Sequence, residues 1–260
     1  MRLMIILLVG LCGGMLGGGC RTMPAEDVPT ALRVGVTPDY PPLVFKQQKR
    51  LTGAEVELAR ALARKLDRPA QFIELRWDDQ INALLTGKID IIMSGMTITD
   101  TRRVRIEFTE PWLQLGLMAL VRSRDTAKYP GAIVLMAGDA GVGVQKDSTA
   151  AVFVNRNYRG INSITYLDPL DAPYYLTSRK IDAFIHDGPA LIWMASENEA
   201  ELAVLPYLMT ADMIAWGVRK DDDELLREVN AVLAGWRQDG TIDRVVEKWL
   251  PLPRGLVKTP

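Results

Sequence analysis

Apolar and polar residues follow two different spacings over residues 31–93. Three short apolar runs indicate buried strands. Between them, apolar side chains recur every three or four residues with charges on the other side, as in amphipathic helices. This β-α-β-α-β order predicts a mostly parallel sheet covered by helices. The predicted strands are 31–36, 71–75 and 89–93, and the predicted helices are 54–66 and 79–85.

The second half of the chain repeats this architecture without repeating its sequence. The apolar run 115–121 predicts a strand and the polar stretch 122–131 a loop, after which strand and helix patterns alternate again. Two α/β units joined by extended strands indicate a cleft between two lobes, a common place for ligands. The strands predicted here are 141–144, 163–166, 181–185 and 214–218, and the helices are 148–155, 170–178, 189–196, 221–236 and 241–250.

The first twenty residues differ from the rest. Arg2 is followed by an apolar run, a Gly-rich stretch and Cys20. The apolar run is shorter than the ~20 residues of a membrane span, and it fits a secretory signal peptide over residues 1–20. The end of this segment resembles a bacterial lipobox, although Leu16 stands one position too early. We expect lipidation of Cys20 and anchoring to the membrane; plain secretion and a cytosolic protein with an apolar tail are the alternatives.

Residues 21–31 are polar, contain two prolines and predict a tether. Cys12 would leave with the signal peptide, so one cysteine remains and no internal disulfide can form. We therefore expect a protein that is secreted across the inner membrane, either periplasmic or lipid-anchored. We also expect it to be a monomer stabilised by its core alone.

Composition narrows the possible functions. The 260 residues include 31 basic and 32 acidic side chains, and the short basic cluster at 102–105 is followed by Glu107 and Glu110. This balance argues against nucleic acid as a partner. The sequence also lacks a Ser-His-Asp set, a His/Cys metal-binding spacing and a phosphate-binding loop. We predict no catalytic residues, no metal and no cofactor.

Residues 93–103 carry the clearest candidate chemistry. They follow a predicted strand and offer hydroxyls at Ser94, Thr97 and Thr99 and a guanidinium at Arg102. Arg can hold a carboxylate with two parallel hydrogen bonds, which Lys cannot do. A strand end that delivers such groups to the start of a helix can hold a small anion. The alternative is a solvated Arg102 in a charged helical turn, with Thr99 as the helix N-cap.

Seven short motifs follow one another along the chain. They are Thr37-Pro-Asp-Tyr-Pro-Pro-Leu43, Gly53-Ala-Glu-Val-Glu-Leu58, Leu84-Leu-Thr-Gly-Lys-Ile-Asp90, Thr97-Ile-Thr-Asp-Thr-Arg102, Val142-Gly-Val-Gln-Lys-Asp-Ser-Thr149, Ile181-Asp-Ala-Phe-Ile-His-Asp187 and Asp239-Gly-Thr241. Each motif alone is weak. In this order they resemble the bacterial extracellular solute-binding proteins that deliver polar amino acids to ABC importers, and the resemblance runs from about Leu32 to Leu250.

This resemblance implies an α/β fold of the two-lobe periplasmic-binding-protein type (type II), in which the ligand lies between the lobes. Lobe 1 would comprise residues 32–119 and 212–252, lobe 2 residues 120–211, and residues 253–260 would form a tail. The resemblance further implies a receptor, not an enzyme, that closes on a free α-amino acid. The hinge would lie at residues 118–121 and 208–212, and the partner would be the permease of an ABC importer.

The resemblance also suggests roles for single residues. Arg102 stands where the family binds the ligand α-carboxylate, Thr97 where a hydroxyl supports the amino-acid backbone, and Asp187 where an acid receives the α-ammonium. Ser148 and Thr149 match second-lobe groups that close on the carboxylate. The other predicted binding residues, which would line or wall the pocket, are Thr37, Tyr40, Trp77, Ser94, Gly95 and Met96.

Some of these positions have simpler explanations. Asp187 precedes Gly-Pro and could simply cap a helix. Ser148 and Thr149 favour helix caps, whose amides rather than side chains would meet an anion. His186, the only histidine, alternates with Asp187 along a strand, so we expect its side chain to point away from the site.

Departures from the family pattern bear on the ligand. Asp147 replaces a Gly in the second-lobe turn, where a side chain requires a negative φ. Gly95 replaces a common Ser and removes one donor. Thr37 occupies a place that is often acidic in members that bind cationic side chains, although Asp39 could still supply a charge. We expect a neutral or polar ligand side chain rather than a cationic one.

Two other functions stay open. Some relatives of this family dehydrate cyclohexadienyl acids such as arogenate with an added acid in the cleft, but Gly188, Pro189 and Ala190 after Asp187 supply none. Related domains are also fused to signalling modules, so a ligand-sensing domain is the second alternative.

Overall fold

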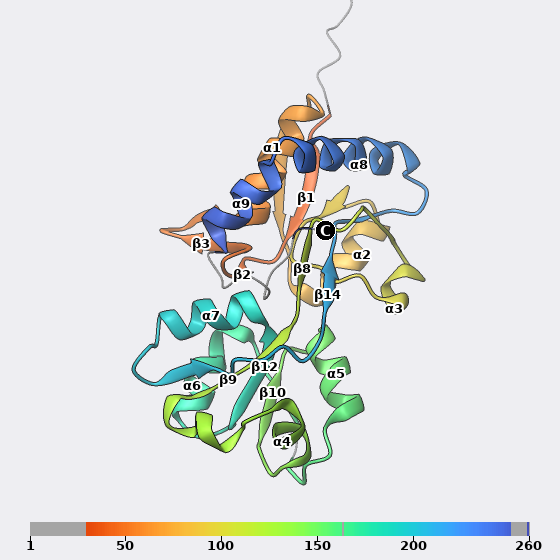
Figure 1. Cartoon of the computed structure of the whole chain (residues 1–260). Helices are drawn as coiled ribbons and strands as arrows, with labels where there is room; N and C mark the ends of the chain where they lie inside the picture. Colours follow the sequence, from red (N-terminus) through yellow and green to blue (C-terminus); the bar gives the residue numbers. More distant parts are fainter. Residues whose placement is uncertain (1–29, 163, 251–258, 260) are drawn as a thin grey trace, which may run out of the picture.

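The computed structural model describes residues 30–162, 164–250 and 259. The predicted signal peptide, Cys20, residues 21–29 of the tether and most of the predicted tail lie outside the described residues. Two α/β lobes stand one above the other (Figure 1), which confirms the predicted fold. Within the described ranges, no helix is both long and apolar enough to cross a bilayer.

Lobe 1, the upper lobe in Figure 1, is built on a sheet of order β5-β1-β6-β15-β7. β1 pairs in parallel with β5 and β6, as the alternating pattern predicts, and β15 joins antiparallel from near the end of the chain. The apolar side of α1 packs into the core of this lobe. The elements are β1 (Leu32–Val36), α1 (Ala54–Lys65), β5 (Ala70–Glu74), the 3-10 helix η1 (Trp77–Asp79), α2 (Gln80–Leu85), β6 (Ile91–Ile92), α3 (Asp100–Arg103), β7 (Glu107–Phe108), β15 (Gly217–Val218), α8 (Asp223–Gln238) and α9 (Thr241–Trp249).

Lobe 2, the lower lobe, holds a sheet of order β11-β10-β12-β9-β13. β10 runs parallel to β11 and β12, while β9 is antiparallel to β12 and β13. α7 follows β12 directly and α5 follows β10 after a short turn. The elements are β9 (Leu117–Arg122), η2 (Ser123–Lys128), α4 (Ala132–Ala137), β10 (Val142–Val144), α5 (Thr149–Asn157), β11 (Ile164–Tyr166), η3 (Pro169–Asp171), α6 (Ala172–Thr177), β12 (Ala183–Asp187), α7 (Gly188–Ser196) and β13 (Leu202–Val204).

A small antiparallel sheet was not predicted, because its prolines and polar residues are typical of loops. It consists of β2 (Asp39–Tyr40), β3 (Val44–Gln47) and β4 (Arg50–Thr52). This sheet belongs to lobe 1 and reaches lobe 2, since the Tyr40 hydroxyl donates to Asp187 of β12. The unpredicted sheet therefore positions one wall of the space between the lobes.

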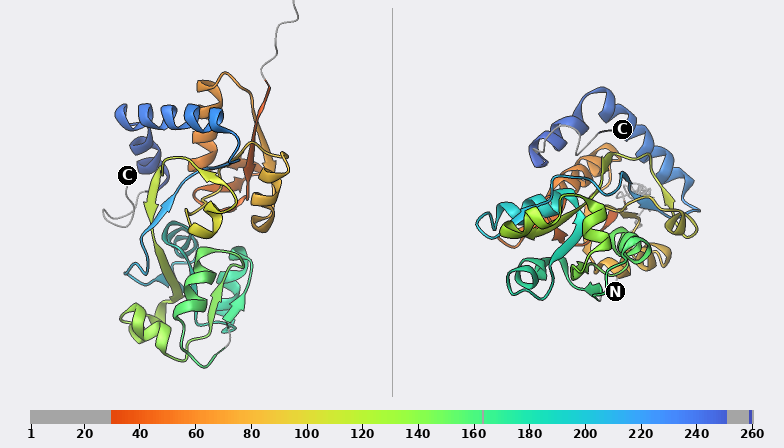
Figure 2. Two further views of the ribbon diagram at one scale, coloured as in Figure 1. Left: turned by 90° about the vertical axis from the view of Figure 1, so that its right-hand side faces the viewer. Right: turned by 60° about the horizontal axis from the view of Figure 1, so that its bottom comes forward.

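Two extended segments carry the chain between the lobes (Figure 2). β8 (Leu113–Leu115) and β14 (Asp212–Ile214) pair antiparallel there. The strand predicted over 115–121 is interrupted at Gly116, after which β9 pairs with β12 of lobe 2. The predicted hinge at 118–121 is therefore wrong, because those residues lie inside the lobe-2 sheet. The crossing is at Gly116, opposite Thr210, which falls in the other predicted segment.

The crossing leaves no room for a side chain at Gly116. A Cβ placed there would lie 2.2 Å from the carbonyl oxygen of Thr210. Gly116→Ala is expected to lower the free energy of unfolding by about 1–3 kcal/mol, because the added methyl overpacks the crossing. Gly235→Ala in α8 is the control: its Cβ would meet nothing within 4 Å, and Ala is favoured over Gly in helices by up to about 1 kcal/mol. Urea unfolding that gives both variants the same change would contradict the close approach.

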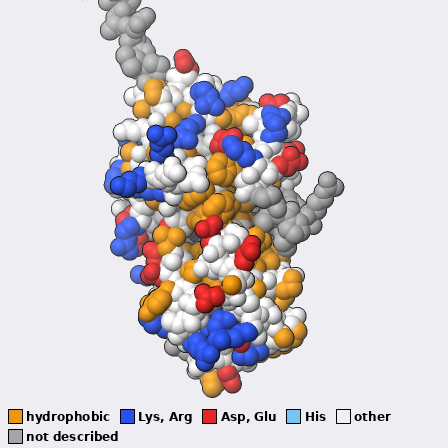
Figure 3. Space-filling view, turned by 90° about the vertical axis from the view of Figure 1, so that its left-hand side faces the viewer, with side chains coloured by type: hydrophobic (Ala, Val, Ile, Leu, Met, Phe, Trp, Pro, Cys, Tyr) orange, Lys and Arg blue, Asp and Glu red, His pale blue; other side chains and the backbone are white. Residues whose placement is uncertain are grey.

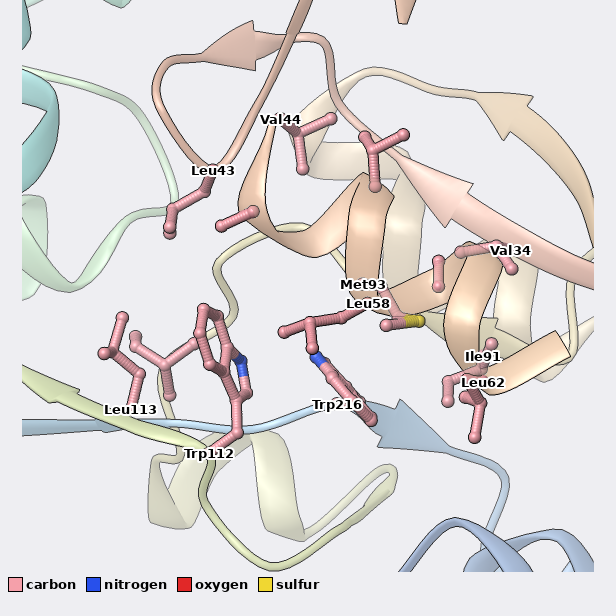
Figure 4. Packing of buried hydrophobic residues seen from close by; sticks show 14 of the residues in the cluster. Val34, Leu43, Val44, Leu58, Leu62, Ile91, Met93, Trp112, Leu113 and Trp216 are labelled. Carbon is pink, nitrogen blue, oxygen red and sulfur yellow. The ribbon is translucent and has the colours of Figure 1, made fainter. Parts of the chain in front are cut away.

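The core of lobe 1 contains a buried carboxyl group. Trp112 and Trp216 lie near each other in this core (Figure 4), with ring centroids 6.5 Å apart. Both indole N–H groups donate to Oε1 of Glu55, over 3.1 and 3.0 Å. Oε2 of Glu55 accepts the amide N–H of Gly95. Glu55 of α1 thereby ties two core tryptophans to the loop that follows β6.

Candidate functional site

A cavity lies where the two lobes meet. It holds about 400 Å³ of empty space, part of it open to solvent. Ten of the eleven predicted binding residues line it; Met96 is the exception. The lining residues are Thr37, Asp39, Tyr40, Trp77, Ser94, Gly95, Thr97 and Arg102 from lobe 1, and Gln145, Ser148, Thr149, Pro169, His186 and Asp187 from lobe 2.

Arg102 supplies a cation from lobe 1. Its Nη1 donates to the Thr97 carbonyl over 2.8 Å, and its guanidinium lies 5.1 Å from the centre of the Trp77 ring. Burial lowers the pKa of Arg102 to about 10, while the carboxylates of Asp187 and Asp212 act in the opposite direction. Among the described residues, no carboxylate comes within salt-bridge distance of Arg102. Two of its five N–H groups donate to carbonyls, so donors remain for a bound anion.

Asp187 supplies a carboxyl group from lobe 2. It occupies the N-cap position of α7, but its side chain makes no cap hydrogen bond, so the simple capping role is wrong. Instead Oδ2 accepts the Tyr40 hydroxyl over 2.5 Å, while Oδ1 is buried without a partner in the described part of the chain. Burial raises the pKa of Asp187 to about 6, opposed by Tyr40 and Arg102. A cation and an acid from different lobes thus face one cavity.

His186 also lines this cavity, contrary to the prediction that it points away. The cavity lies across the end of β12, where both faces of the strand can reach it. His186 is 5% exposed, and its imidazole stacks on Phe184 and forms a T-shaped contact with Tyr40. Burial lowers the pKa of His186 to about 4, so the ring is neutral at physiological pH.

The turn before α5 brings backbone groups to the cavity. Ser148 caps α5, since its hydroxyl accepts the Ala151 amide over 3.1 Å, as the capping alternative predicts. Asp147 has a φ of 58°, so the expected negative φ is wrong; Asp tolerates this left-handed conformation better than most residues. Its exposed side chain is not part of the cavity lining. Its carbonyl accepts from Trp77 over 3.1 Å and from Arg102 over 3.4 Å.

The floor of the cavity in lobe 1 is hydrogen-bonded. The Ser94 hydroxyl accepts the Thr37 amide, and the Thr37 hydroxyl accepts Nε2 of Gln80, each over 2.8 Å. Gly95 adopts a φ of 67°, and a Cβ there would lie 2.2 Å from the Tyr40 ring. After this turn Met96 points into an apolar cluster of lobe 1, so its predicted place in the pocket is wrong.

The two lobes touch directly around the cavity. Besides the Tyr40–Asp187 bond, Phe45 of β3 packs against Trp193 of α7 with ring centroids 5.1 Å apart. On the face that Figure 3 shows, apolar side chains gather at the level where the lobes meet. These contacts hold the two lobes together around the cavity.

A wider groove continues from the cavity toward solvent. Asp39 of lobe 1 lies at the junction, near Asp168 of lobe 2. Burial, and secondly the charge of Asp168, raise the pKa of Asp39 to about 6. The groove also carries cations, so its charge is mixed. Its lining residues are Asp39, Arg76, Trp77, Asp78, Gln145, Lys146, Tyr166, Leu167, Asp168 and Pro169.

Comparison with known proteins identifies similar chains. Residues 32–252 match the family model of the bacterial extracellular solute-binding proteins, family 3. The L-cystine-binding protein TcyJ of Escherichia coli (strain K12) is 30% identical over 219 residues, which cover 84% of this chain and 82% of that protein. The histidine-binding periplasmic protein of Salmonella typhimurium is 29% identical over 249 residues, 90% of this chain and 93% of that one.

A solved structure has the same architecture. It is that of the ancestral amino acid-binding protein AncCDT-1, described as a precursor of cyclohexadienyl dehydratase. It is 33% identical, covers 84% of this chain and 95% of its own, and superposes with a TM-score of 0.78.

Proposed function

Because the chain belongs to the bacterial extracellular solute-binding proteins of family 3, we propose that it captures a free α-amino acid between its lobes and hands it to the permease of an ABC importer. The observation that carries this proposal is the pairing of Arg102 and Asp187 around one cavity. An α-amino acid has a carboxylate and an ammonium held one backbone apart, which these two groups complement. Relatives whose names specify L-cystine and histidine support an amino acid as the ligand.

Binding would be coupled to closure. Arg102 and Asp187 belong to different lobes, so each alone is half a site, and the crossing at Gly116 and Thr210 joins the two halves. Charge-assisted hydrogen bonds contribute roughly 1.5–3 kcal/mol each, and micromolar affinity requires about 8 kcal/mol. A few such bonds that form only in the closed state are sufficient to shift the population toward closure.

The amino acid would meet lobe 1 at Thr97 and Arg102, and lobe 2 at the turn that begins α5. Tyr40, Trp77 and Thr37 would surround the start of its side chain. Their lack of formal charge supports a neutral or polar side chain. Asp39 would affect only a longer side chain, and its raised pKa makes it a weak attractor of cations near pH 6.

The site of action is outside the cytoplasm. We propose a periplasmic monomer or a lipoprotein anchored at Cys20. Mass spectrometry of the protein purified from its membrane fraction, with Cys20→Ala as the control, tests the anchor.

A thermal-shift screen against the twenty amino acids and L-cystine tests the proposed function. An amino acid at 100 times its dissociation constant should stabilise the folded protein by about 2.7 kcal/mol. Isothermal titration then gives the affinity. A wild-type protein that binds none of these compounds at millimolar concentration contradicts the proposal.

We propose a receptor rather than an enzyme, although AncCDT-1 is described as a precursor of a dehydratase. Gly188, Pro189 and Ala190 after Asp187 add no acid to the cavity. Incubation with prephenate and arogenate is expected to give no elimination product; product formation would instead support the dehydratase-like function.

A further inference from the structure

Two residues that line this cavity each carry a buried acceptor atom without a partner. Among the described residues, Nδ1 of His186 and Oδ1 of Asp187 make no hydrogen bond. Both residues are more than nine-tenths buried and both line the cavity. The nearer oxygen of Asp187, Oδ2, lies 3.9 Å from Nδ1 and already accepts the Tyr40 hydroxyl. Buried polar atoms in folded proteins normally have partners, so these two atoms call for a donor from outside the chain.

The surroundings of His186 favour one neutral tautomer. Nε2 lies 3.3 Å from Oε1 of Gln145, and this contact is a hydrogen bond in the tautomer that carries its proton on Nε2, because an amide oxygen can only accept. Nδ1 then carries a lone pair and is an acceptor. Burial keeps the ring neutral, because it lowers the pKa of His186 to about 4. The contacts with Phe184 and Tyr40 hold the ring plane in place.

We propose that Nδ1 of His186 accepts a hydrogen bond from the α-ammonium of the bound amino acid and so shares that group with Oδ1 of Asp187. This inference rests on the proposed function and adds a binding residue to it. A hydrogen bond spans about 2.7–3.2 Å, so acceptors less than about 6 Å apart can share one nitrogen. An ammonium has three N–H donors, and a carboxylate oxygen with a neutral imidazole nitrogen satisfies two of them without a second negative charge.

The single histidine of the chain makes a direct spectroscopic test possible. In uniformly ¹⁵N-labelled protein, the two imidazole nitrogens give one pair of signals, whose shifts identify the tautomer. We expect the neutral form protonated at Nε2 before ligand is added. Saturation with an unlabelled amino acid selected by the thermal-shift screen should shift the Nδ1 signal toward that of a hydrogen-bonded acceptor, with Nε2 still protonated. A proton on Nδ1, or an Nδ1 signal unchanged by binding, would overturn the inference.

Two variants distinguish the role of the Nδ1 acceptor from that of the ring packing. His186→Phe keeps a flat ring against Phe184 and Tyr40 but removes the lone pair, so affinity should fall at least tenfold. His186→Gln restores an acceptor and should bind within about threefold of wild type. Tyr207→Phe is the control, because it removes a tyrosine hydroxyl of lobe 2 that lies outside the cavity. This variant should bind as the wild type does. Equal affinity of His186→Phe and wild type would overturn the inference.

The two proposals fail in different ways. If the wild-type protein binds no amino acid, the proposed function fails and this inference falls with it. If it binds one while His186→Phe binds equally well and Nδ1 does not respond, the receptor function stands and only the role of His186 is lost. Should His186→Phe not fold, the nitrogen shifts of the wild-type protein decide alone.

Discussion

Arg102→Ala is expected to weaken amino-acid binding by about 3–5 kcal/mol, two to three and a half orders of magnitude in the dissociation constant. The reason is that the ligand carboxylate would be enclosed between the lobes with no opposite charge. A carboxylate deprived of its partner in a closed site incurs its desolvation cost without compensation. The variant would also lose the hydrogen bonds from Arg102 to the carbonyls of Thr97 and Asp147. The bond to Asp147 connects the two lobes, so its loss would add to the effect.

Two further variants show which property of Arg102 matters. Arg102→Lys keeps the charge but loses the two-pronged geometry, and we expect an intermediate affinity, at least tenfold weaker than wild type. Arg103→Ala is the matched control, because Arg103 is the next residue in α3, is exposed and does not line the cavity. Isothermal titration of the three variants with one amino acid gives the comparison. Binding by Arg102→Ala within threefold of wild type would remove this residue from the site.

The position of Arg102 could be predicted because it depends on local rules. An apolar run that ends in small polar residues before a helix N-cap identifies a strand end, and the Thr99 hydroxyl does accept the Arg102 amide. Asp187 likewise follows a buried strand and precedes Gly-Pro. Since both lobes have parallel strands whose ends meet the cleft, motifs far apart in the sequence converge there without any knowledge of side-chain packing.

Side-chain directions at the strand ends were harder to predict. Gly95 in the left-handed region reverses the alternation, which turns Met96 into the core. At the end of β12, strand alternation no longer separates a buried face from a cavity face, so His186 reaches the site together with Asp187. Gln145 and Pro169 line the cavity but carry no sequence signal, because they come from turns whose path is set by tertiary contacts.

The second large effect is expected from Glu55, a residue outside the cavity. Burial raises the pKa of Glu55 to about 7, although hydrogen bonds from Gly95, Trp216 and Trp112 act in the opposite direction. All three donors belong to lobe 1, so the effect does not depend on whether the lobes are closed. The folded protein therefore holds a proton on this group at pH values where the unfolded chain has released it.

This raised pKa fixes the sign of a pH dependence. From pH 4.5 to about 7 the unfolded state binds fewer protons at Glu55 than the folded state, so stability falls as pH rises. A rise in the pKa from 4.5 to about 7 corresponds to roughly 3 kcal/mol. Below pH 4.5 the contribution is fully present, and above pH 7 it is lost. The pKa of Asp187 is raised from 3.8 to about 6, so this group should add its own loss of stability as the pH rises from 3.8 to about 6.

Urea unfolding of wild type and Glu55→Gln at pH 4.5, 6 and 7.5 measures this contribution. Glutamine does not titrate, so the difference in unfolding free energy between the two proteins should change by roughly 3 kcal/mol over this range. At pH 4.5 the variant should be less stable than wild type. Its side-chain NH₂ group would face the N–H of Gly95, so two donors would lie opposite each other, at a cost of about 1–3 kcal/mol. At pH 7.5 the wild-type protein carries a buried charge and this disadvantage should shrink or reverse.

Glu57→Gln is the matched control on the same helix. Although burial raises the pKa of Glu57, hydrogen bonds from Lys248 and Trp249 lower it overall. The Glu57→Gln variant should therefore lose stability between pH 4.5 and 7.5 as the wild-type protein does. A constant difference between wild type and Glu55→Gln from pH 4.5 to 7.5 would contradict the raised pKa. Because Glu55 also holds the amide of Gly95, whose turn lines the cavity, ligand affinity of the Gln variant should fall together with its stability at pH 4.5.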